Sequence, residues 1–275
     1  MSPLATRVAA DKAAPWIERL ARMGFLAKGV LYMTIGALAV RTALGLRATH
    51  GTDEHGAMTG VYSAPFGRAL LAILAFGLLG YGVWRVIEGV HDPERRGTSA
   101  KGIALRIVCV GSGIVHGVLA YTAARIVLHQ SVGKSDSDHA KDLSARALEL
   151  PGGIYALWIT ALILLGYGAF QLYCAWKAML DDQLELGHMN DGARRAVYGV
   201  SRFGIAARGI VFGAMGMLFV RAATHQAPNK AGGIADAMQW LVQLGRWPFA
   251  LIASGVIAYG IYELICARYM RIAVR

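Results

Sequence analysis

Charged residues are scarce in this sequence. Only 16% of its 275 residues are Asp, Glu, Lys or Arg, and 56% are hydrophobic, whereas soluble domains carry about 25% charged residues. So few charges cannot cover the surface of a soluble protein. Several apolar runs also reach the roughly 20 residues that a helix needs to span a hydrocarbon layer of about 30 Å. The composition therefore excludes a soluble domain and predicts an all-α, polytopic integral membrane protein.

Cysteine is rare as well. The three cysteines, Cys109, Cys174 and Cys266, form no CxxC pair, which argues against a disulfide framework and against a zinc site. Residues 1–21 have no apolar core before a small-residue cleavage site, so we expect a retained cytoplasmic segment and not a signal peptide. The net charge of +11 comes mostly from Lys and Arg that flank the apolar runs. This placement is typical of membrane topology signals and not of nucleic-acid binding.

Recognisable catalytic motifs are missing. The chain contains no GxSxG, HExxH or GxxxxGK[ST] motif and no GxGxxG that opens a helix, and these motifs carry hydrolase, metalloprotease, nucleotide and dinucleotide chemistry. Apart from His116, the histidines lie in loops or at the end of an apolar run. We therefore expect no catalytic residues, no metal and no cofactor.

The chain does contain a threefold internal repeat. Residues 22–43 are RMGFLAKGVLYMTIGALAVRTA, residues 202–223 are RFGIAARGIVFGAMGMLFVRAA, and residues 110–131 are a degraded third copy. A second motif recurs in step with the first, as GYGVWR at 80–85, GYGAFQ at 166–171 and AYGIYE at 258–263. The unit is a helical hairpin, and we place repeat 1 at 22–97, repeat 2 at 102–182 and repeat 3 at 194–275.

Each repeat supplies two predicted membrane spans. They cover residues 24–46, 68–90, 107–128, 154–176, 203–223 and 247–267. Two spans return the chain to the same side, so the repeats are parallel, and parallel repeats are related by an axis along the membrane normal. We therefore expect a six-helix bundle with pseudo-threefold symmetry. Lys and Arg are more abundant on the side of both termini, which predicts that the termini are cytoplasmic.

The connections within the repeats differ in character. Residues 47–62 and 129–150 are polar and are expected to be loops. In residues 232–245, by contrast, Ile234, Met238 and Leu241 recur at helical spacing. This segment is predicted to be a short helix that lies on the membrane surface.

The repeated motifs resemble those of a known family. The R-x-G-x-x-A-[KR]-G helix, the P-F-G start of the second span and the G-Y-G-x-aromatic string are similar to the bacterial membrane family catalogued as domain of unknown function 1206. The resemblance covers about residues 16–268. Repeat 2 departs from it, because Val110 replaces the arginine and His116 replaces the Lys or Arg. The resemblance implies three two-helix units in a bacterial inner membrane and assigns no activity.

Lys28, His116 and Arg208 occupy the same position in the three repeats. Charges inside spans cost roughly 2.5–3.5 kcal/mol at the bilayer centre and are functional candidates for that reason. One interpretation is that these side chains extend to the headgroups and anchor the bundle. A second is an inward cationic ring that binds an anionic substrate, ion or lipid headgroup. A third is ion pairing within the bundle.

A second set, Arg85, Gln171 and Glu263, shares a position near the ends of the even-numbered spans. A carboxylate without a partner in an apolar run would take up a proton. We therefore expect Glu263 to pair with Lys28, Arg208 or Arg85.

Glycines predict where helices approach closely. Gly113-x-x-x-Gly117 and Gly209-x-x-x-Gly213 form small-residue ridges, and Gly29 shares the position of Gly117 and Gly209; such glycines let helix backbones pack in lipid. The GYG strings do not indicate a potassium filter, which needs re-entrant loops from four subunits or repeats. Their tyrosines are more typical of an aromatic layer near the membrane interface.

Three functional interpretations remain open. The first is a non-enzymatic membrane module, either structural or bound to a partner or lipid, with anionic lipid headgroups, another membrane protein or a second copy as partners. The second is a solute or ion pathway along the pseudo-threefold axis, with Lys28, His116 and Arg208 as its cationic constriction. The third is an enzyme or redox partner that acts on lipid or quinone.

Overall fold

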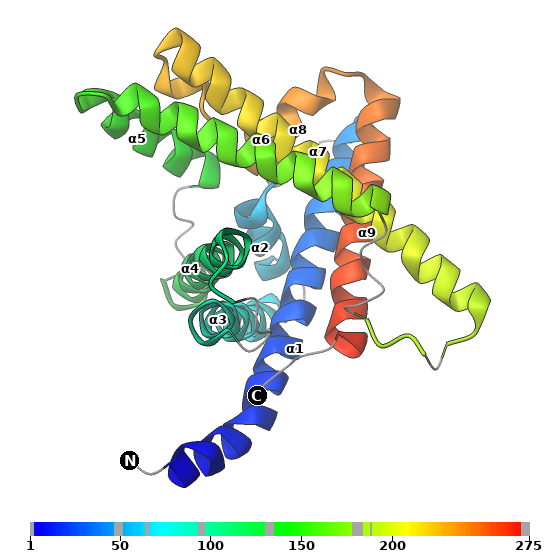
Figure 1. Ribbon diagram of the computed structural model, residues 1–275. Helices are drawn as coiled ribbons and strands as arrows, with labels where there is room; N and C mark the ends of the chain where they lie inside the picture. The colour runs from blue at the N-terminus through cyan, green and yellow to red at the C-terminus, as the bar shows by residue number, and fades with distance from the viewer. Residues whose placement is uncertain are drawn as a thin grey trace.

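The computed structural model describes residues 3–46, 52–63, 66–92, 97–129, 135–177, 184–187 and 189–270. Within these residues the chain is almost entirely helical (Figure 1). The long helices are α1 (Pro3–Ala43), α3 (Gly67–His91), α4 (Ala100–His129), α6 (Gly153–Lys177), α7 (Asp191–His225) and α9 (Arg246–Tyr269). The short helices are α2 (Glu54–Tyr62), α5 (Asp136–Glu149), α8 (Ile234–Val242) and the 3₁₀ helix η1 (Pro228–Lys230).

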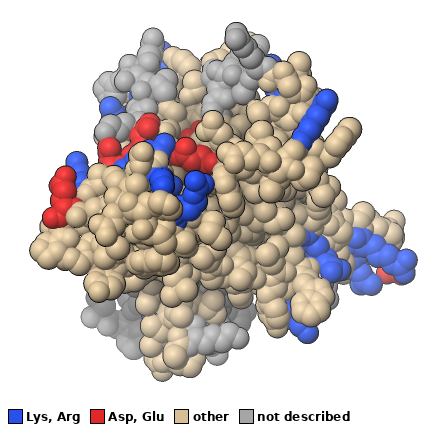
Figure 2. Space-filling view, turned by 90° about the horizontal axis from the view of Figure 1, so that it is seen from above, with Lys and Arg blue, Asp and Glu red and all other residues tan. Residues whose placement is uncertain are grey.

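All six long helices are long and apolar enough to cross a membrane. On the face drawn in Figure 2, the charged side chains gather in separate groups, and the wide areas between them carry no Lys, Arg, Asp or Glu. Large apolar side chains such as Leu162, Ile163 and Ile107 are exposed on the protein surface. In water such a surface would drive association. The protein is thus an all-α multi-pass membrane protein, as its composition predicts.

Each repeat consists of a long helix, a short helix and a second long helix. The helix at 234–242 is confirmed, but the prediction that 47–62 and 129–150 are loops is wrong, since α2 and α5 lie there. The search for apolar periodicity did not predict α2 and α5, because polar capping residues define where these helices begin. The Asp53 side chain accepts from Gly56 N at 2.8 Å, and Ser135 and Asp138 form a reciprocal capping box.

The first helix also differs from the prediction. We expected an N-terminal segment, 1–21, that is separate from a span beginning near residue 24. The structure instead has one continuous helix, α1, from Pro3 to Ala43. Between Pro3 and Gly24 this helix contains one proline, Pro15, and no glycine. The polar residues of its first half are compatible with a helix that extends beyond the apolar layer.

The long helices form three equivalent pairs. The second long helix of each repeat packs along the first long helix of the next, so that α3 pairs with α4, α6 with α7 and α9 with α1. In Figure 1, α1 and α9 run side by side up the picture, α6 and α7 cross it, and α3 and α4 are seen end-on. The three pairs are steeply inclined to one another. This cyclic pairing is the pseudo-threefold arrangement that the repeats predict.

Contacts within a repeat are less uniform. In repeat 1, α1 packs on α3, and in repeat 3, α7 packs on α9, but in repeat 2 the described residues of α4 and α6 barely touch. The short helix α5 contacts α6, η1 and α8, and it has no comparable contact with α4. The six-helix ring is therefore open at one place, which we call the α4–α6 opening.

Small residues account for the two closed interfaces. A Cβ at Gly24 would overlap Tyr81, and a Cβ at Gly204 would overlap the Tyr259 backbone, so each interface requires a glycine. A Cβ at Gly77 would likewise lie 2.8 Å from that of Ala27. Repeat 2 has larger residues at the equivalent positions, which are Ser112 for Gly24, Val115 for Ala27 and Ile163 for Gly77. The close approach seen in repeats 1 and 3 is sterically unavailable to α4 and α6.

Candidate functional site

A cavity of about 370 Å³ lies where the six long helices converge, and all six contribute to its wall. Lys28, His116 and Arg208 all line it, together with Arg85, Gln171 and Glu263. The structure therefore brings the two sequence-defined sets together on one axial site instead of directing the cations to the headgroups.

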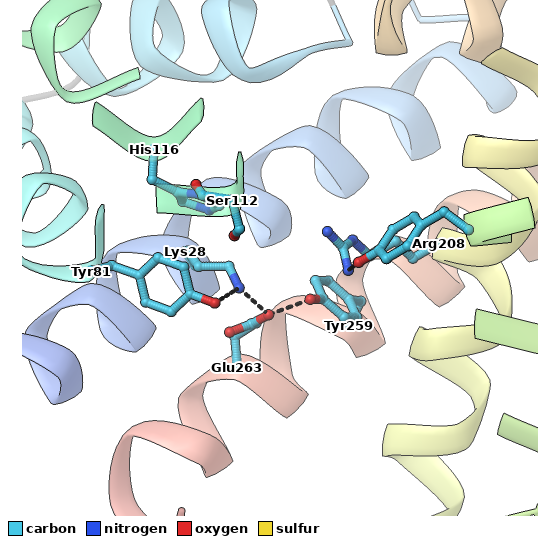
Figure 3. Close-up of polar contacts among 8 residues, drawn as sticks. Lys28, Tyr81, Ser112, His116, Arg208, Tyr259 and Glu263 are labelled. Atoms are coloured by element: carbon cyan, nitrogen blue, oxygen red, sulfur yellow. Dashed lines mark hydrogen bonds and ion pairs between the residues drawn. The ribbon is translucent and has the colours of Figure 1, made fainter. Parts of the chain in front are cut away.

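Lys28 and Glu263 form the centre of this site. Lys28 Nζ donates to Glu263 Oε1 at 2.7 Å and to the Tyr81 hydroxyl at 3.2 Å, and both charged side chains are almost fully buried. The Tyr259 hydroxyl also donates to Glu263 Oε1. Figure 3 shows Lys28, Tyr81, Tyr259 and Glu263 joined in one network. Of the three partners that the sequence offers to Glu263, Lys28 is the one at ion-pair distance.

Arg208 lies across the cavity in a different environment (Figure 3). Its Nη1 donates to the Tyr167 hydroxyl at 2.8 Å, and its guanidinium carbon is 4.8 Å from the Tyr259 ring centroid and 5.0 Å from that of Phe212. Such cation–π contacts contribute about 0.5–2 kcal/mol each. Among the described residues Arg208 makes no ion pair, and its Nε has no hydrogen-bond partner. A guanidinium carries five donors, so most of the donor capacity of Arg208 is unused.

His116 is the third member of the sequence-predicted ring, and its contacts differ from those of Lys28 and Arg208. Its Nδ1 is 2.7 Å from the carbonyl oxygen of Ser112, one turn earlier on α4, and its ring lies 4.6 Å from that of Tyr81. A ring nitrogen next to a carbonyl oxygen must carry a proton, so Nδ1 is the donor of this contact. His116 therefore contributes a polar wall whose Nδ1 is committed to its own helix.

The second set explains why Lys28 and Arg208 differ. Repeat equivalence across the inter-repeat interfaces matches Lys28 with Glu263 and Arg208 with Gln171. Lys28 contacts Glu263 itself, and the Cβ of Gln171 lies 3.1 Å from the position of a Cβ at Gly209. The remaining member, Arg85, is paired on its own helix with Glu88 at 2.6 Å. The repeat position that holds the carboxylate of Glu263 for Lys28 thus holds the neutral amide of Gln171 for Arg208.

Glycines of both helix sets meet at the inter-repeat interfaces. A Cβ at Gly82 would lie 2.9 Å from Gly113 O and 3.2 Å from Gly117 N, and a Cβ at Gly168 would lie 2.8 Å from Gly209 O and 2.9 Å from Gly213 N. In the third interface a Cβ at Gly260 would lie 2.8 Å from Gly29 O. The second glycine of each GYG string is therefore a helix-packing position, and the intervening tyrosine points into the cavity.

The packing glycines are not equal. A Cβ at Gly29 would overlap Leu264, and one at Gly113 would lie 2.7 Å from Gly82 O, but a Cβ at Gly117 or Gly213 would meet nothing within 4 Å. Gly117 and Gly213 thus present their backbone to the partner helix, while their Cβ positions point to open space.

Three arginines close the ends of the helix pairs in an equivalent way. Arg22 donates to the carbonyls of Ala267 and Arg268, Arg202 to those of Ala175 and Trp176, and Arg106 to those of Gly89 and Val90. A cation at a helix C-terminus satisfies orphan carbonyls and complements the helix dipole. The sequence comparison treated Val110 as a loss in repeat 2. The structure shows that Arg106, one turn earlier, takes over the same role.

Sequence reasoning missed the role of the tyrosines. Tyr81, Tyr167 and Tyr259 were expected in an interfacial aromatic layer, but all three line the cavity and each hydrogen-bonds a charged group. Their shared position next to the packing glycine of the GYG string was a signal for this. Within the described residues no group of three or more His, Cys, Asp or Glu side chains is arranged to hold a metal ion.

Beyond Arg208 the axis is packed. Tyr32, Ile35, Met238 and Val256 are buried there, and the remaining void is only about 10 Å³, close to the minimum for a single water molecule. The short helix α8 contributes Met238 to this plug. Among the residues that the structure describes, the cavity therefore narrows to this small void beyond Arg208 and forms no wide channel there.

Comparisons with known proteins agree with this architecture. The profile of the family described as Domain of Unknown Function (DUF1206) matches three segments, residues 23–92, 107–178 and 203–270. The uncharacterized protein YxxB of Bacillus subtilis (strain 168) is 30% identical over 260 residues, which cover 93% of this chain and 92% of that protein. No solved structure matches the chain significantly. The three matched segments coincide with the three helical repeats, and the chain belongs to the DUF1206 family.

Proposed function

We propose that this protein is a non-enzymatic membrane module that binds the anionic group of an amphiphile in its axial cavity. The observation that supports this most directly is the contrast between two equivalent cations. Lys28 is neutralised by Glu263, whereas Arg208 is surrounded by aromatic rings and has no carboxylate partner among the described residues. A buried cation without a counter-charge is costly, and a bound anion would remove that cost.

The chemistry of the wall favours an amphiphile over a small hydrated ion. Next to Arg208 the cavity is lined by Tyr167, Phe212 and Tyr259, and elsewhere by Tyr262, Val108 and Val115. Ligand sites commonly combine an apolar wall with a few converging polar groups that fix orientation. The unused donors of the guanidinium match phosphate or carboxylate geometry, which arginine binds in a bidentate manner. An anion with an attached apolar group satisfies both parts of the wall.

The membrane orientation that we propose is consistent with this ligand class. The cavity lies toward the end of the bundle where α3, α6 and α9 finish, since it includes Arg85, Cys266 and Met270. The excess of Lys and Arg on that side supports a cytoplasmic location of both termini in the bacterial inner membrane. The cytoplasmic leaflet is the one whose anionic lipids produce a negative surface potential. The packed axis beyond Arg208 gives less support to a solute pathway.

A binding assay with a defined probe tests the proposal. The full chain is purified in a neutral maltoside detergent, and its thermal midpoint is measured as dodecyl phosphate is added. We expect a saturable rise for the wild type and no rise for Arg208→Gln. Arg125→Gln is the matched control, because Arg125 lies on the exposed face of α4 near Tyr121 and outside the cavity. An equal response of wild type and Arg208→Gln would contradict the proposal.

A further inference from the structure

The α4–α6 opening leads to the axial cavity. On the wall formed by α1 and α9 the charged lining residues are buried, with Lys28 4% and Glu263 2% exposed. On the α4 wall, by contrast, the lining residues Val108 and Val115 are 49% and 56% exposed. The cavity is therefore closed by helix contacts on one side and accessible from the lipid-facing side of repeat 2.

We propose that an anionic phospholipid enters the site sideways through the α4–α6 opening, so that its headgroup meets Arg208 and an acyl chain lies between α4 and α6. This inference rests on the proposed function and adds the access route and the ligand class. Repeat 2 is the unit specialised for access, because Ser112, Val115 and Ile163 replace the small residues that close the corresponding interfaces of repeats 1 and 3.

The size of the cavity supports a lipid that is only partly enclosed. A volume of about 370 Å³ is near the lower end of the roughly 300–1,000 Å³ typical of small-molecule sites. It accommodates a headgroup but not two acyl chains, so the chains must lie outside the polar pocket. Exposed apolar side chains at the opening, Val108 and Val115 on α4 and Ile163 on α6, offer the chains a matching surface.

The charge of the site selects among lipids. A zwitterionic headgroup brings its own cation, which would lie in a cavity that already holds the positive charges of Lys28, Arg85 and Arg208. Glu263 and Glu88 are committed to Lys28 and Arg85 at 2.7 and 2.6 Å. An anionic headgroup, in contrast, meets the guanidinium of Arg208, which makes no ion pair among the described residues. The favoured ligand is therefore a lipid with net negative charge.

Photo-crosslinking of the unmodified protein tests the route. The full chain is reconstituted in phosphatidylcholine vesicles that contain phosphatidylglycerol with a diazirine on its acyl chain, and adducts are mapped by mass spectrometry. We expect labelling concentrated at Val115, Ile163 and their neighbours, with reduced labelling there when the diazirine is on phosphatidylcholine. Labelling spread evenly over the lipid-facing surfaces of all six long helices would overturn the proposal.

A variant that restores the small residues provides a second test. Ser112→Gly, Val115→Ala and Ile163→Gly together give α4 and α6 the residues that close repeats 1 and 3. We expect this triple variant to lose most of the labelling at the opening, whereas the control Ile114→Ala with Leu162→Ala, two exposed positions outside the cavity wall, keeps it. Unchanged labelling in a folded triple variant would contradict the route.

The two proposals fail in different ways. If dodecyl phosphate still acts through Arg208 but lipid labelling ignores the opening, the anion site stands and the sideways route is wrong. If Arg208→Gln leaves the dodecyl phosphate response intact, the anion site itself is wrong. Inorganic phosphate in solution is the remaining comparison. If it raises the thermal midpoint as effectively as dodecyl phosphate at equal concentration, the ligand comes from solution and the lipid proposal is overturned.

Discussion

Lys28 on α1 and Glu263 on α9 form a buried ion pair, with 2.7 Å between Nζ and Oε1, across the interface that joins the first and last long helices. Because this interface closes the cyclic order of the repeats, the pair links the two ends of the chain. The carboxylate of Glu263 is already paired with Lys28. Arg208 therefore remains the cation available to a ligand.

Removing one member of this pair should destabilise the protein strongly. Lys28→Met leaves Glu263 buried with the Tyr259 hydroxyl as its remaining described partner, and loss of one partner of a buried pair costs about 3–5 kcal/mol. We expect the double variant Lys28→Met/Glu263→Gln to recover most of that loss, because no uncompensated charge remains. Unfolding in mixed micelles of sodium dodecyl sulfate and a neutral detergent measures both. Additive losses in the double variant would show that the two side chains do not interact.

Two glycines on the first long helices of repeats 2 and 3 should respond in opposite ways to alanine. Gly204→Ala places a Cβ against the Tyr259 backbone, and overpacking of this kind costs about 1–3 kcal/mol. Gly117→Ala meets nothing within 4 Å, so it should be neutral or stabilise the helix by up to about 1 kcal/mol. The same unfolding assay compares them. A larger loss for Gly117→Ala than for Gly204→Ala would contradict the helix packing described here.

The arginine caps predict a rescue within repeat 2. Arg106→Gln removes two charged hydrogen bonds to the end of α3, and we expect it to lower the free energy of unfolding by about 1–3 kcal/mol. Val110 occupies the position of Arg22 and Arg202, and its side chain lies beside Gly89. Arg106→Gln/Val110→Arg should therefore regain much of the lost stability, as judged by thermal unfolding. No recovery in the double variant would argue against equivalent caps.

Supplying Arg208 with its missing carboxylate should abolish ligand binding without harming the fold. Gln171 corresponds to Glu263 in the repeat and packs beside Gly209. In Gln171→Glu the new carboxylate would neutralise Arg208 from within the protein. We expect an unchanged or higher thermal midpoint and no further rise with dodecyl phosphate. Gln171→Met is the matched control, and it should retain the response. Loss of the response in both variants would instead indicate that the amide itself binds the ligand.

The sequence predicted the architecture because repeats encode symmetry. The shared positions of Lys28, His116 and Arg208 and of the GYG strings were enough to predict six membrane-crossing helices in a pseudo-threefold order. The short helices α2 and α5 escaped prediction, since polar capping by Asp53 and Ser135, and not apolar periodicity, defines them. The continuous α1 was not predicted either, because a helix can extend past the apolar layer and because Pro15 in its first half is itself a helix-breaking signal.

The candidate site was only half visible in the sequence. That Lys28, Arg208 and Glu263 are equivalent or neighbouring repeat positions followed from alignment of the copies. Whether their side chains point to the axis or to the headgroups depends on helix rotation, which the apolar pattern of an almost wholly hydrophobic helix does not fix. The α4–α6 opening could have been suspected from Ser112, Val115 and Ile163. Its significance emerges only once Gly24, Ala27 and Gly77 are seen in contact.

Crystallography with a brominated lipid tests the account most directly. Phosphatidylglycerol brominated on its acyl chains is bound to the full chain, and anomalous scattering locates the bromine atoms while the headgroup density is examined beside Arg208. The account predicts bromine peaks between α4 and α6 and a phosphate within hydrogen-bond distance of the guanidinium. Bromine peaks confined to the outer surface, with protein or water filling the space beside Arg208, would contradict it.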